Sequence, residues 1–380
     1  MKIIYLHQYF KFPDESGGTR SYDLANEFSK LGYDINILTS TSDKKYKKMK
    51  NWFKVKKNGL VIHYIYLPYS NYMSYFQRLI SFFKFFCLST AKIMTLKGDL
   101  VLATSTPLTV GIPALIKKWI HKTPFIFEVR DVWPEAVIAI GAVKNKIFQK
   151  ILYFLEYLIY KNANALVPLS IDMKHSIVSR YPKLSKKPII VIENISEINR
   201  FQNFAKNKSS LLKKKIGFKP RFTILYAGAF GKVNGISYLI EFASKLIHYD
   251  SSIVFVLIGD GIEKNQLINN AKNKKILNKN VFFLNPVSKE KLPQLYFECD
   301  MGSSFVISVK ELWANSANKF FDTLAASKPI LINYKGWQKN VINKKKIGYV
   351  LSTDINDQMI KKFLNYSQNR LLILNQQKKA

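Results

Sequence analysis

Cysteine and acidic side chains are both scarce in this chain of 380 residues. The two cysteines, Cys87 and Cys299, are too far apart to match a metal-binding or redox motif, so we expect a reduced, cytoplasmic setting and no metal site. The 25 acidic residues are outnumbered by 59 basic ones, which gives a formal net charge of +34. This excess favours an anionic partner, either a polyanion or a membrane surface, although a compositional bias toward lysine would also produce it.

Arginine is scarce as well, with 7 of the 59 basic residues. Recognition of bases and phosphates in nucleic acids favours arginine, so no nucleic-acid partner is expected. The chain also lacks a long uninterrupted apolar run. Its first residues, MKIIYLHQYF, become polar too early for a secretory signal, and charged residues interrupt the apolar stretch at 71–87, so no segment is expected to span a bilayer.

Short apolar runs alternate with helical patterns along the whole chain, which is typical of parallel sheets covered by helices. The pattern lapses into a polar, lysine-rich linker and loop at 196–220 and then resumes. Since 380 residues exceed what one compact core supports, we predict an α/β fold with two doubly wound parallel-sheet (Rossmann-like) domains, 1–195 and 221–380, facing a cleft. The expected strands are KIIYL, INILTS, LVIHYIYL, LVLATS, PFIFEV, ALVPLS and IIVIEN in the first domain, and RFTILYAGAF, IVFVLIGDG, VFFLNPVS, CDMGSSFVIS, KPILINY and IGYVLS in the second.

Two adjacent glycines, Gly17 and Gly18, follow the first strand and precede an amphipathic helical pattern, TRSYDLANEFSKLG. They lack the GxGxxG spacing of a dinucleotide site. Two interpretations stay open: a purely structural turn, or a loop that brings a helix N-terminus close to anionic ligand groups.

Charged residues also follow a later strand of the first half, in FEVRDVWPEA. Arg130, Asp131 and Glu135 lie just past the apolar run, at the end where parallel sheets bind ligands, and are candidate site residues. The alternative is a structural ion pair between Arg130 and one of the carboxylates. His7, at the end of the first strand, is either a buried, hydrogen-bonded histidine or a ligand contact.

The second half repeats this arrangement of strand, glycine loop and helix. YAGAFGKVNG places Lys232 among three glycines, where its charge can neutralise a diphosphate. Farther on, in KELWANSANKFFDTLAASKPI, Ser316 is expected to cap a helix that starts near Ala317. The free backbone N–H groups of its first turn, which includes Asn318 and Lys319, would then face the cleft.

Five motifs, HQYF, SGGTR, RDVWPE, YAGAFG and ANSANKFFDTLAASKPI, occur in this order over nearly the whole length. Together they resemble the family-four glycosyltransferases of the GT-B fold, and most of all the WbuB-like branch. The resemblance implies a nucleotide-sugar donor, typically UDP-linked, bound mainly by the second domain, and an acceptor bound mainly by the first. It further implies retaining transfer of an N-acetylated sugar, such as N-acetylfucosamine, in O-antigen or capsule biosynthesis, without a metal or other cofactor.

Residue roles follow from the same resemblance. Gly17 and Gly18 resemble the loop that borders the donor phosphates, and Lys232 resembles one of two basic diphosphate contacts, the other place being taken by Ala229. Asp322 resembles the acid expected on the ribose hydroxyls. The acid expected on the donor sugar falls at Ala314 in the usual spacing, and Glu311 is the nearest carboxylate.

No residue is a convincing covalent nucleophile. We therefore expect front-face transfer, in which the leaving phosphate helps to deprotonate the acceptor while Arg130, Asp131 and Glu135 orient it. The same architecture suits a UDP-sugar epimerase, which would ignore an acceptor, and the high charge suits a non-enzymatic basic protein on a membrane surface. Glycine loops at matching positions of both halves favour the transferase over a scaffold.

Two stretches favour peripheral attachment to the inner face of the plasma membrane, where a lipid-linked acceptor would be met: KKYKKMKNWFKVKK and the aromatic helix NYMSYFQRLISFFKFFC. Within that helix we expect a stripe that includes Phe76, Leu79 and Phe83 to face the core. Phe85 is expected on the outer face, near Arg78.

Overall fold

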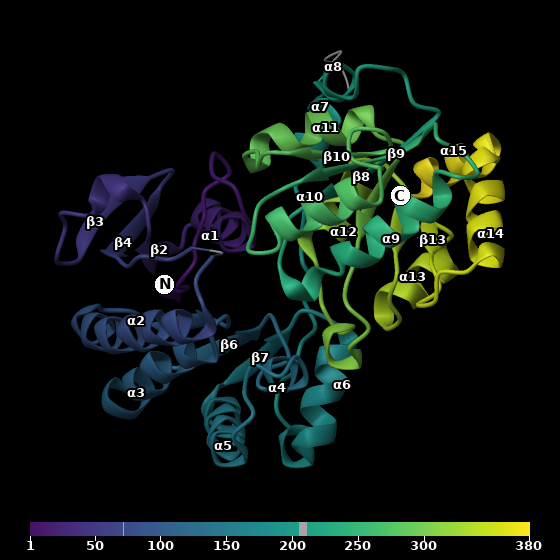
Figure 1. Ribbon diagram of the computed structural model, residues 1–380. Coiled ribbons are helices and arrows are strands. Elements are labelled where there is room, and N and C mark those ends of the chain that lie inside the picture. Colours follow the sequence, from purple (N-terminus) through teal and green to yellow (C-terminus); the bar gives the residue numbers. More distant parts are fainter. Residues whose placement is uncertain (71, 205–210) are drawn as a thin grey trace. The chain divides into compact units, whose positions relative to one another are not determined.

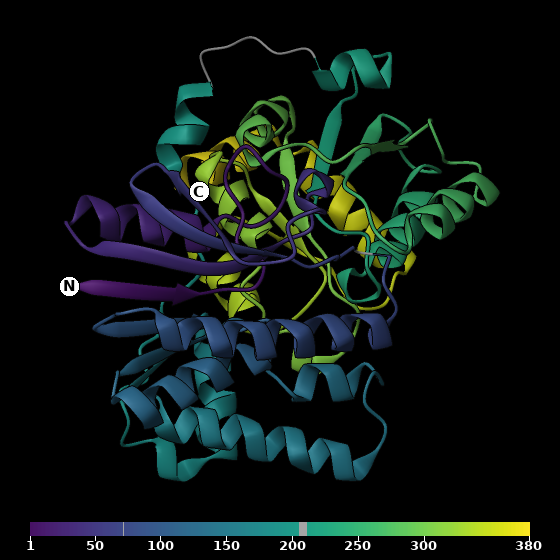
Figure 2. The ribbon, with the colours of Figure 1, turned by 90° about the vertical axis from the view of Figure 1, so that its left-hand side faces the viewer.

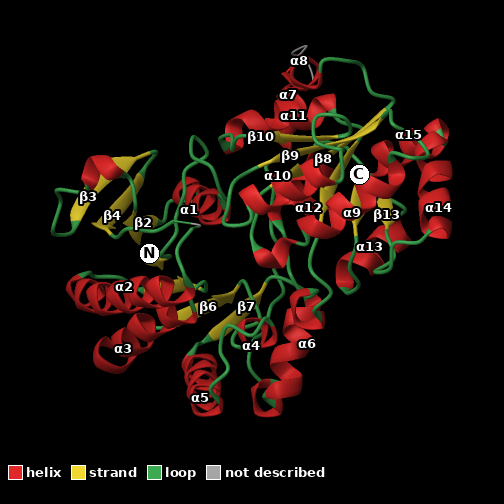
Figure 3. Cartoon of the chain, viewed as in Figure 1, coloured by secondary structure: helices red, strands yellow, loops and turns green. Residues whose placement is uncertain are grey.

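The computed structural model describes residues 1–70, 72–204 and 211–380. The chain forms two compact units. The first comprises Met1–Phe12, Thr19–Glu193 and Ala314–Ser316, and the second comprises Pro13–Gly18, Asn194–Trp313 and Ala317–Ala380. Each unit is built on a sheet of parallel strands, with one antiparallel edge strand in the first unit, and helices cover both faces, which confirms the predicted α/β class (Figure 3).

The first unit contains a seven-stranded sheet in the order β3-β4-β2-β1-β5-β6-β7, in which only β3 runs antiparallel to its neighbour. Side chains alternate along β1: Ile4 and Leu6 join the core on one face, and Ile3 and Tyr5 join the core on the other. The strands are β1 (Lys2–Leu6), β2 (Asp34–Thr41), β3 (Phe53–Lys57), β4 (Leu60–Tyr66), β5 (Leu100–Thr104), β6 (Phe125–Val129) and β7 (Ala165–Pro168).

Two details of this sheet differ from the expectation. The lysine-rich segment at 53–57 forms β3, because Asn58 and Gly59 both adopt positive φ angles and turn the chain back in a tight hairpin. The expected strand IIVIEN instead makes a single bridge, between Ile189 and Leu166.

Helices cover both faces of the first sheet. Helix α1 (Arg20–Lys30) packs against β2 and β4, and α3 packs against both α2 and α5 in a layer that is visible in Figure 2. The other helices of this unit are α2 (Tyr75–Thr95), α3 (Gly111–His121), α4 (Glu135–Ala139), α5 (Lys146–Asn162) and α6 (Ile171–Arg180).

Helix α2 buries the side opposite to the one expected. Ser81, Phe85, Ser89 and Ile93 are buried at four-residue intervals, whereas most of the predicted core stripe is exposed. The reason is that apolar residues occur almost all around this helix, so aromatic side chains do not distinguish its two faces. The inner face is distinguished by small serines, which let the helix approach the sheet.

The second unit contains a six-stranded, fully parallel sheet in the order β10-β9-β8-β11-β12-β13. Its strands are β8 (Phe222–Ala227), β9 (Ile253–Ile258), β10 (Val281–Leu284), β11 (Met301–Ser304), β12 (Ile330–Ile332) and β13 (Gly348–Val350). Its helices, labelled in Figure 1, are α7 (Ile198–Phe204), α8 (Leu211–Ile216), α9 (Ile236–Leu246), α10 (Lys264–Asn273), α11 (Leu292–Glu298), α12 (Asn318–Ala325), α13 (Trp337–Lys345), α14 (Asp357–Gln368) and α15 (Arg370–Lys379).

The core of this unit has two sides. Helix α9 contributes Leu239, Phe242 and Leu246 to one cluster of buried residues, and α12 contributes Phe320 to another. The strand order reverses between β8 and β11, so the loops that follow these two strands leave the sheet toward opposite faces. Sheets of this type bind ligands at such a switch point, beyond the carboxyl ends of the strands.

Candidate active site

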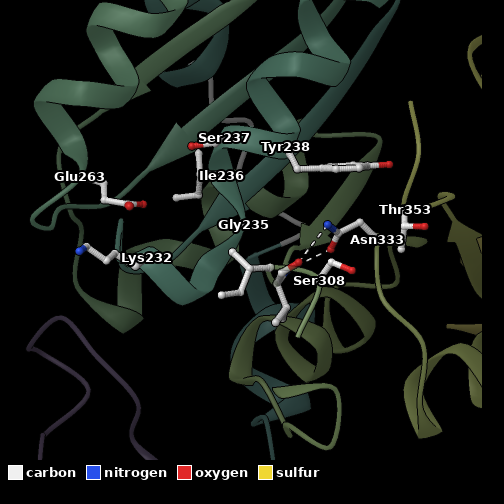
Figure 4. A pocket seen from close by; sticks show the side chains of 11 residues that line it. Lys232, Gly235, Ile236, Ser237, Tyr238, Glu263, Ser308, Asn333 and Thr353 are labelled. Carbon is white, nitrogen blue, oxygen red and sulfur yellow. Dashed lines mark hydrogen bonds between the residues drawn. The ribbon is translucent and has the colours of Figure 1, made fainter. Parts of the chain in front are cut away.

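A pocket of about 290 Å³ lies at the switch point of the second unit (Figure 4). The β8–α9 loop contributes Lys232, and the segment after β11 contributes Ser308. Glu263 and Lys232 lie toward one end of the pocket, and Tyr238 and Thr353 lie toward the other. The pKa of Glu263 is raised by burial, and the nearby Lys232 cation opposes this shift.

Two local features hold the walls of this pocket in place. The side chain of Asn333, after β12, accepts from the backbone N–H of Val306 and donates to its carbonyl, both at 3.0 Å. Gly235 has φ +57°, and a Cβ there would lie 2.8 Å from the carbonyl carbon of Val306. The glycine of GKVNG is therefore required, because any side chain would collide with the backbone after β11.

Lys319, in the first turn of α12, brings a second cation to the glycine loop. Its Nζ donates to the Tyr226 hydroxyl at 3.0 Å and lies 4.3 Å from the centre of the Tyr226 ring. The Tyr226 hydroxyl in turn donates to the carbonyl of Ala229. A Cβ on Gly228 would lie 3.2 Å from Nζ, so the loop lies directly against the amine. Burial lowers the pKa of Lys319 to about 8.

The segment Pro13–Gly18 packs beside the start of α12. Its carbonyls at Pro13 and Glu15 accept from the backbone N–H groups of Glu290 and Lys289. Gly17 has φ +129°, and a Cβ on Gly18 would lie 2.4 Å from the Nδ2 atom of Asn318. The glycine pair thus allows a turn and a close backbone approach to the first residue of α12. Its predicted place beside the donor phosphates stays a prediction.

Asn318 itself is held from two sides. Its Oδ1 accepts a hydrogen bond from Asn194, and its amide nitrogen faces Gly18. This arrangement fixes the first turn of α12, and with it the direction of the backbone N–H groups there.

Asp322 is buried, with internal partners for both oxygens. Oδ2 forms an ion pair with Lys289, and Oδ1 accepts from Ser196 Oγ at 2.7 Å. Both side chains of the ion pair are at most 5% exposed. The ribose role predicted for Asp322 would therefore require this carboxylate to accept further bonds beyond the two it already makes.

Ser316 does not cap α12, which corrects the expectation from sequence. The N-cap is Ala317, without a side-chain hydrogen bond, and Ser316 is buried one residue earlier in a short segment, Ala314–Ser316, that belongs to the first unit. The chain changes unit just before the helix, which local sequence signals do not reveal. Glu311 lies exposed on the short turn Lys310–Leu312, and its role toward the donor sugar stays a prediction.

In the first unit, the predicted residues His7, Arg130 and Asp131 all lie just beyond the ends of parallel strands, His7 after β1 and the other two after β6. The Arg130 guanidinium lies 3.4 Å from His7 Nε2, and its backbone N–H donates to Ser105. Thr106 Oγ1 donates to Asp131 at 2.6 Å. Burial and the Arg130 cation hold the pKa of His7 well below its usual value, so the imidazole is neutral.

The neighbour of the neutral His7 ring indicates which of its two nitrogens carries the hydrogen. Because a guanidinium can only donate, Nε2 is the acceptor and Nδ1 carries the hydrogen. That Nδ1–H is buried and has no hydrogen-bond partner among the described residues. Such a group favours a ligand that supplies an acceptor.

Glu135 lies in a different network from the one expected. Its carboxylate pairs with Arg180 of α6 at 2.6 Å and accepts from Ser176 at 2.9 Å. Arg180 also pairs with the buried Glu156. These contacts tie α4, α5 and α6 together, so the carboxylate has a structural partner that the sequence does not indicate.

Sequence reasoning missed Arg20, the last residue of SGGTR. It is 1% exposed and pairs with Glu128 of β6 at 2.8 Å, while Thr104 also donates to that carboxylate. Its guanidinium donates to the carbonyls of Ile192 and Glu193, where the chain leaves the first unit. The feature of the sequence that could have indicated this ion pair is Glu128, an acid inside the apolar run FIFEV. Separately, the described residues include no group of three or more His, Cys, Asp or Glu placed to hold a metal ion.

Comparisons with known proteins cover nearly the whole chain. Residues 17–200 match the family model described as Glycosyltransferase Family 4, and residues 208–376 match the model described as Glycosyl transferases group 1. Spore coat protein SA of Bacillus subtilis (strain 168) is 25% identical over 195 residues, or 49% of this chain and 50% of that protein. The chain thus spans about half the length of this curated relative.

Solved structures share the fold over the full length. Anabaena Alr3699/HepE in complex with UDP-glucose superposes with a TM-score of 0.70 and 14% identity, covering 100% of this chain and 93% of that one. WaaG, described as a glycosyltransferase involved in lipopolysaccharide biosynthesis, gives a TM-score of 0.69 and 14% identity, covering 100% and 94%. These likenesses establish the two-sheet fold.

Proposed function

We propose that this chain is a family-four glycosyltransferase of the GT-B fold, which transfers a sugar from a UDP-linked donor to a lipid-linked or polysaccharide acceptor. The matches of its two halves to the Glycosyltransferase Family 4 and Glycosyl transferases group 1 models support this proposal. The observation that carries this proposal is the pair of lysines around the glycine loop after β8. Lys232 lines the switch-point pocket, and Lys319 reaches the same loop from α12. A diphosphate carries the negative charge that two lysines and a helix N-terminus would stabilise.

The chemistry assigned to the site is front-face transfer with retention. The bond between the anomeric carbon and the diphosphate oxygen breaks, and UDP leaves with the bonding electrons. The acceptor oxygen forms the new bond on the same face and gives its proton to the departing phosphate. Lys232, Lys319 and the first turn of α12 would stabilise the charge that develops on UDP, so the proposal assigns this task to them and not to a metal.

The acceptor is assigned to the first unit. His7, Arg130 and Asp131 lie together beyond the strand ends, and they include a buried Nδ1–H that an acceptor hydroxyl could satisfy. Their proposed role is to orient this hydroxyl. Glu135 is not assigned to the acceptor itself; its proposed role is to hold α4 in place through its ion pair with Arg180.

The finer assignment follows the sequence motifs. We assign the chain to the WbuB-like branch and an N-acetylated donor sugar, and to O-antigen or capsule biosynthesis at the inner face of the plasma membrane. The likeness to WaaG and to a HepE complex with UDP-glucose is consistent with a UDP-linked donor and a surface-polysaccharide acceptor.

The test is an assay of the full chain with a panel of UDP-sugars and a lipid-linked sugar acceptor, with products identified by mass spectrometry. We expect one donor to yield UDP and an acceptor longer by one sugar. An altered UDP-sugar without transfer would indicate an epimerase. Absence of transfer from every donor, in a protein that binds UDP and melts cooperatively, would contradict the proposal.

A further inference from the structure

Arg20 is a charged side chain in the interior of the first unit. Its Nε donates to the Glu128 carboxylate of β6 at 2.8 Å, and both side chains of this ion pair are buried. Glu128 also accepts from the hydroxyl of Thr104. Taking two charges out of water costs free energy that an ion pair does not always offset, so the contribution of such a pair to stability is not enough to explain it.

The other donors of the Arg20 guanidinium bind one short stretch of backbone. Nη2 donates to the carbonyl of Ile192 at 3.0 Å, and Nη1 donates to the carbonyl of Glu193. A guanidinium can bind a carboxylate and two carbonyls at once, because its five N–H groups are fixed in one plane. A lysine ammonium lacks this planar fork.

This stretch of backbone is the end of the first unit, and the chain continues into the second unit at Asn194. The N–H of Ile192 still donates to the carbonyl of Pro168, the last residue of β7, at 3.1 Å. Beyond this bond, the carbonyl of Glu193 is held by Arg20. Arg20 therefore fixes the chain at the residue where the first unit ends.

The residues that follow are held by the second unit. Asn194 donates to Oδ1 of Asn318 at the start of α12, and Ser196 Oγ donates to Asp322 of the same helix at 2.7 Å. The segment 192–196 is thus anchored at one end by a buried arginine and at the other end by α12, the helix whose first turn is assigned to the donor diphosphate.

Arg20 also lies close in sequence to another point where the chain changes unit. Pro13–Gly18 belongs to the second unit, and the chain is back in the first unit from Thr19 onward. A single side chain, two residues after one crossing, therefore holds the backbone of another crossing at Glu193.

We propose that Arg20 is a positioning residue for sugar transfer, an inference that rests on the proposed function. Its guanidinium fixes the first-unit end of the segment that leads into α12. Transfer requires an acceptor assigned to the first unit and a donor assigned to the second, so loosening this end lowers the rate of transfer. UDP binding is assigned to contacts of the second unit, which do not involve Arg20, and is retained.

The experiment compares Arg20→Lys with the parent protein in the transfer assay and in calorimetric titrations with UDP. Lysine keeps a positive charge beside Glu128 but cannot hold both carbonyls through a planar fork. We expect kcat to fall by roughly ten- to a hundredfold, because small misplacements of reacting groups have effects of this size. The affinity for UDP and the KM for the donor should not change. Amide hydrogen exchange of the peptide 189–197 should become several-fold faster.

Arg221→Lys is the matched control. Arg221 of the second unit has the same kind of partners, because it donates to the Asp250 carboxylate and to the carbonyl of Ser367, both at 2.9 Å. Its substitution should leave kcat and the exchange of 189–197 as in the parent protein. If Arg20→Lys does not fold, Arg20→Met/Glu128→Gln removes both buried charges together and gives the same comparison.

Three results would overturn the inference: a folded Arg20 variant with the kcat of the parent protein, unchanged exchange at 189–197, or a loss of UDP affinity that parallels the loss of kcat. The last result is the one that a merely structural role of Arg20 produces. Failure of the proposed function has a different signature, because the parent protein itself then transfers no sugar, and the inference fails with it.

Discussion

At the scale of single residues, Lys319 is the group whose chemistry depends most on its surroundings. Its amine faces a tyrosine and a glycine loop, and its pKa is lowered by burial to about 8, from 10.5 for an ordinary lysine. It lies against the loop that contains Ala229, where the family resemblance leads one to expect a second cation. The first turn of α12 supplies this cation from another part of the sequence.

We predict that UDP binding weakens as pH rises through about 8, because Lys319 loses its charge there in the free protein. A bound diphosphate favours the charged amine, so binding above this pH must be accompanied by proton uptake. Lys319→Met should weaken UDP binding and remove the pH dependence, while Lys319→Arg should retain binding at high pH. Calorimetric titrations at several pH values, in buffers of different ionisation enthalpy, would measure both effects. An unchanged pH profile in Lys319→Met would show that another group is responsible.

A second residue-scale prediction concerns the buried pair of Asp322 and Lys289. Asp322→Asn leaves the ammonium of Lys289 buried without its counter-charge, which should destabilise the protein by about 3 kcal/mol. The double variant Asp322→Leu/Lys289→Met should recover part of this loss, because it removes both charges together. Denaturant unfolding would measure the stabilities, and UDP titration of the folded fraction would test the ribose role separately. A fully stable Asp322→Asn variant with weak UDP binding would favour the ribose role over the structural one.

At the scale of elements, strands were predictable because a buried parallel strand needs a continuous apolar run. The face that α2 buries could not be predicted, because apolar side chains occur nearly all around this helix. Only the small residues Ser81 and Ser89, which are buried, indicate its inner face. The ion pairs Arg20–Glu128 and Glu135–Arg180 join residues that are far apart in sequence, so local patterns could not identify them. The same holds for Ser316, which lies where the chain passes between units.

The turn from β8 into α9 offers an element-scale test. Gly235→Ala adds both the strain of a left-handed alanine and an overlap with the backbone of Val306, whereas Gly32→Ala, at φ +86° with open space around it, adds only the strain. We expect Gly32→Ala to cost about 1 kcal/mol and Gly235→Ala clearly more. Thermal and denaturant unfolding of the pair would measure the difference. Equal losses would mean that the contact with Val306 relaxes freely.

At the scale of the whole molecule, the order of apolar and helical patterns was enough to predict two parallel sheets, and the structure confirms them. The exchange of two short segments between the units was beyond that pattern. Pro13–Gly18 belongs with the second unit, although the residues on both sides of it in the sequence belong to the first. Ala314–Ser316 belongs with the first unit, although its sequence neighbours belong to the second. These segments contain the predicted site residues Gly17, Gly18 and Ser316, which is why the site was harder to predict than the fold.

The net charge of +34 gives a last prediction at this scale. Self-repulsion destabilises the compact state, and raising monovalent salt from about 10 mM to about 150 mM shortens the Debye length from about 30 Å to about 8 Å. We therefore expect the melting temperature to rise over this range. The same salt weakens exposed ion pairs such as Lys30–Glu27, but each contributes at most about 1 kcal/mol, and buried pairs such as Asp322–Lys289 are screened little. Scanning calorimetry in NaCl and KCl at matched ionic strength would separate screening from binding of one particular ion. A melting temperature that falls with both salts would show that ion pairs outweigh the repulsion among the lysines.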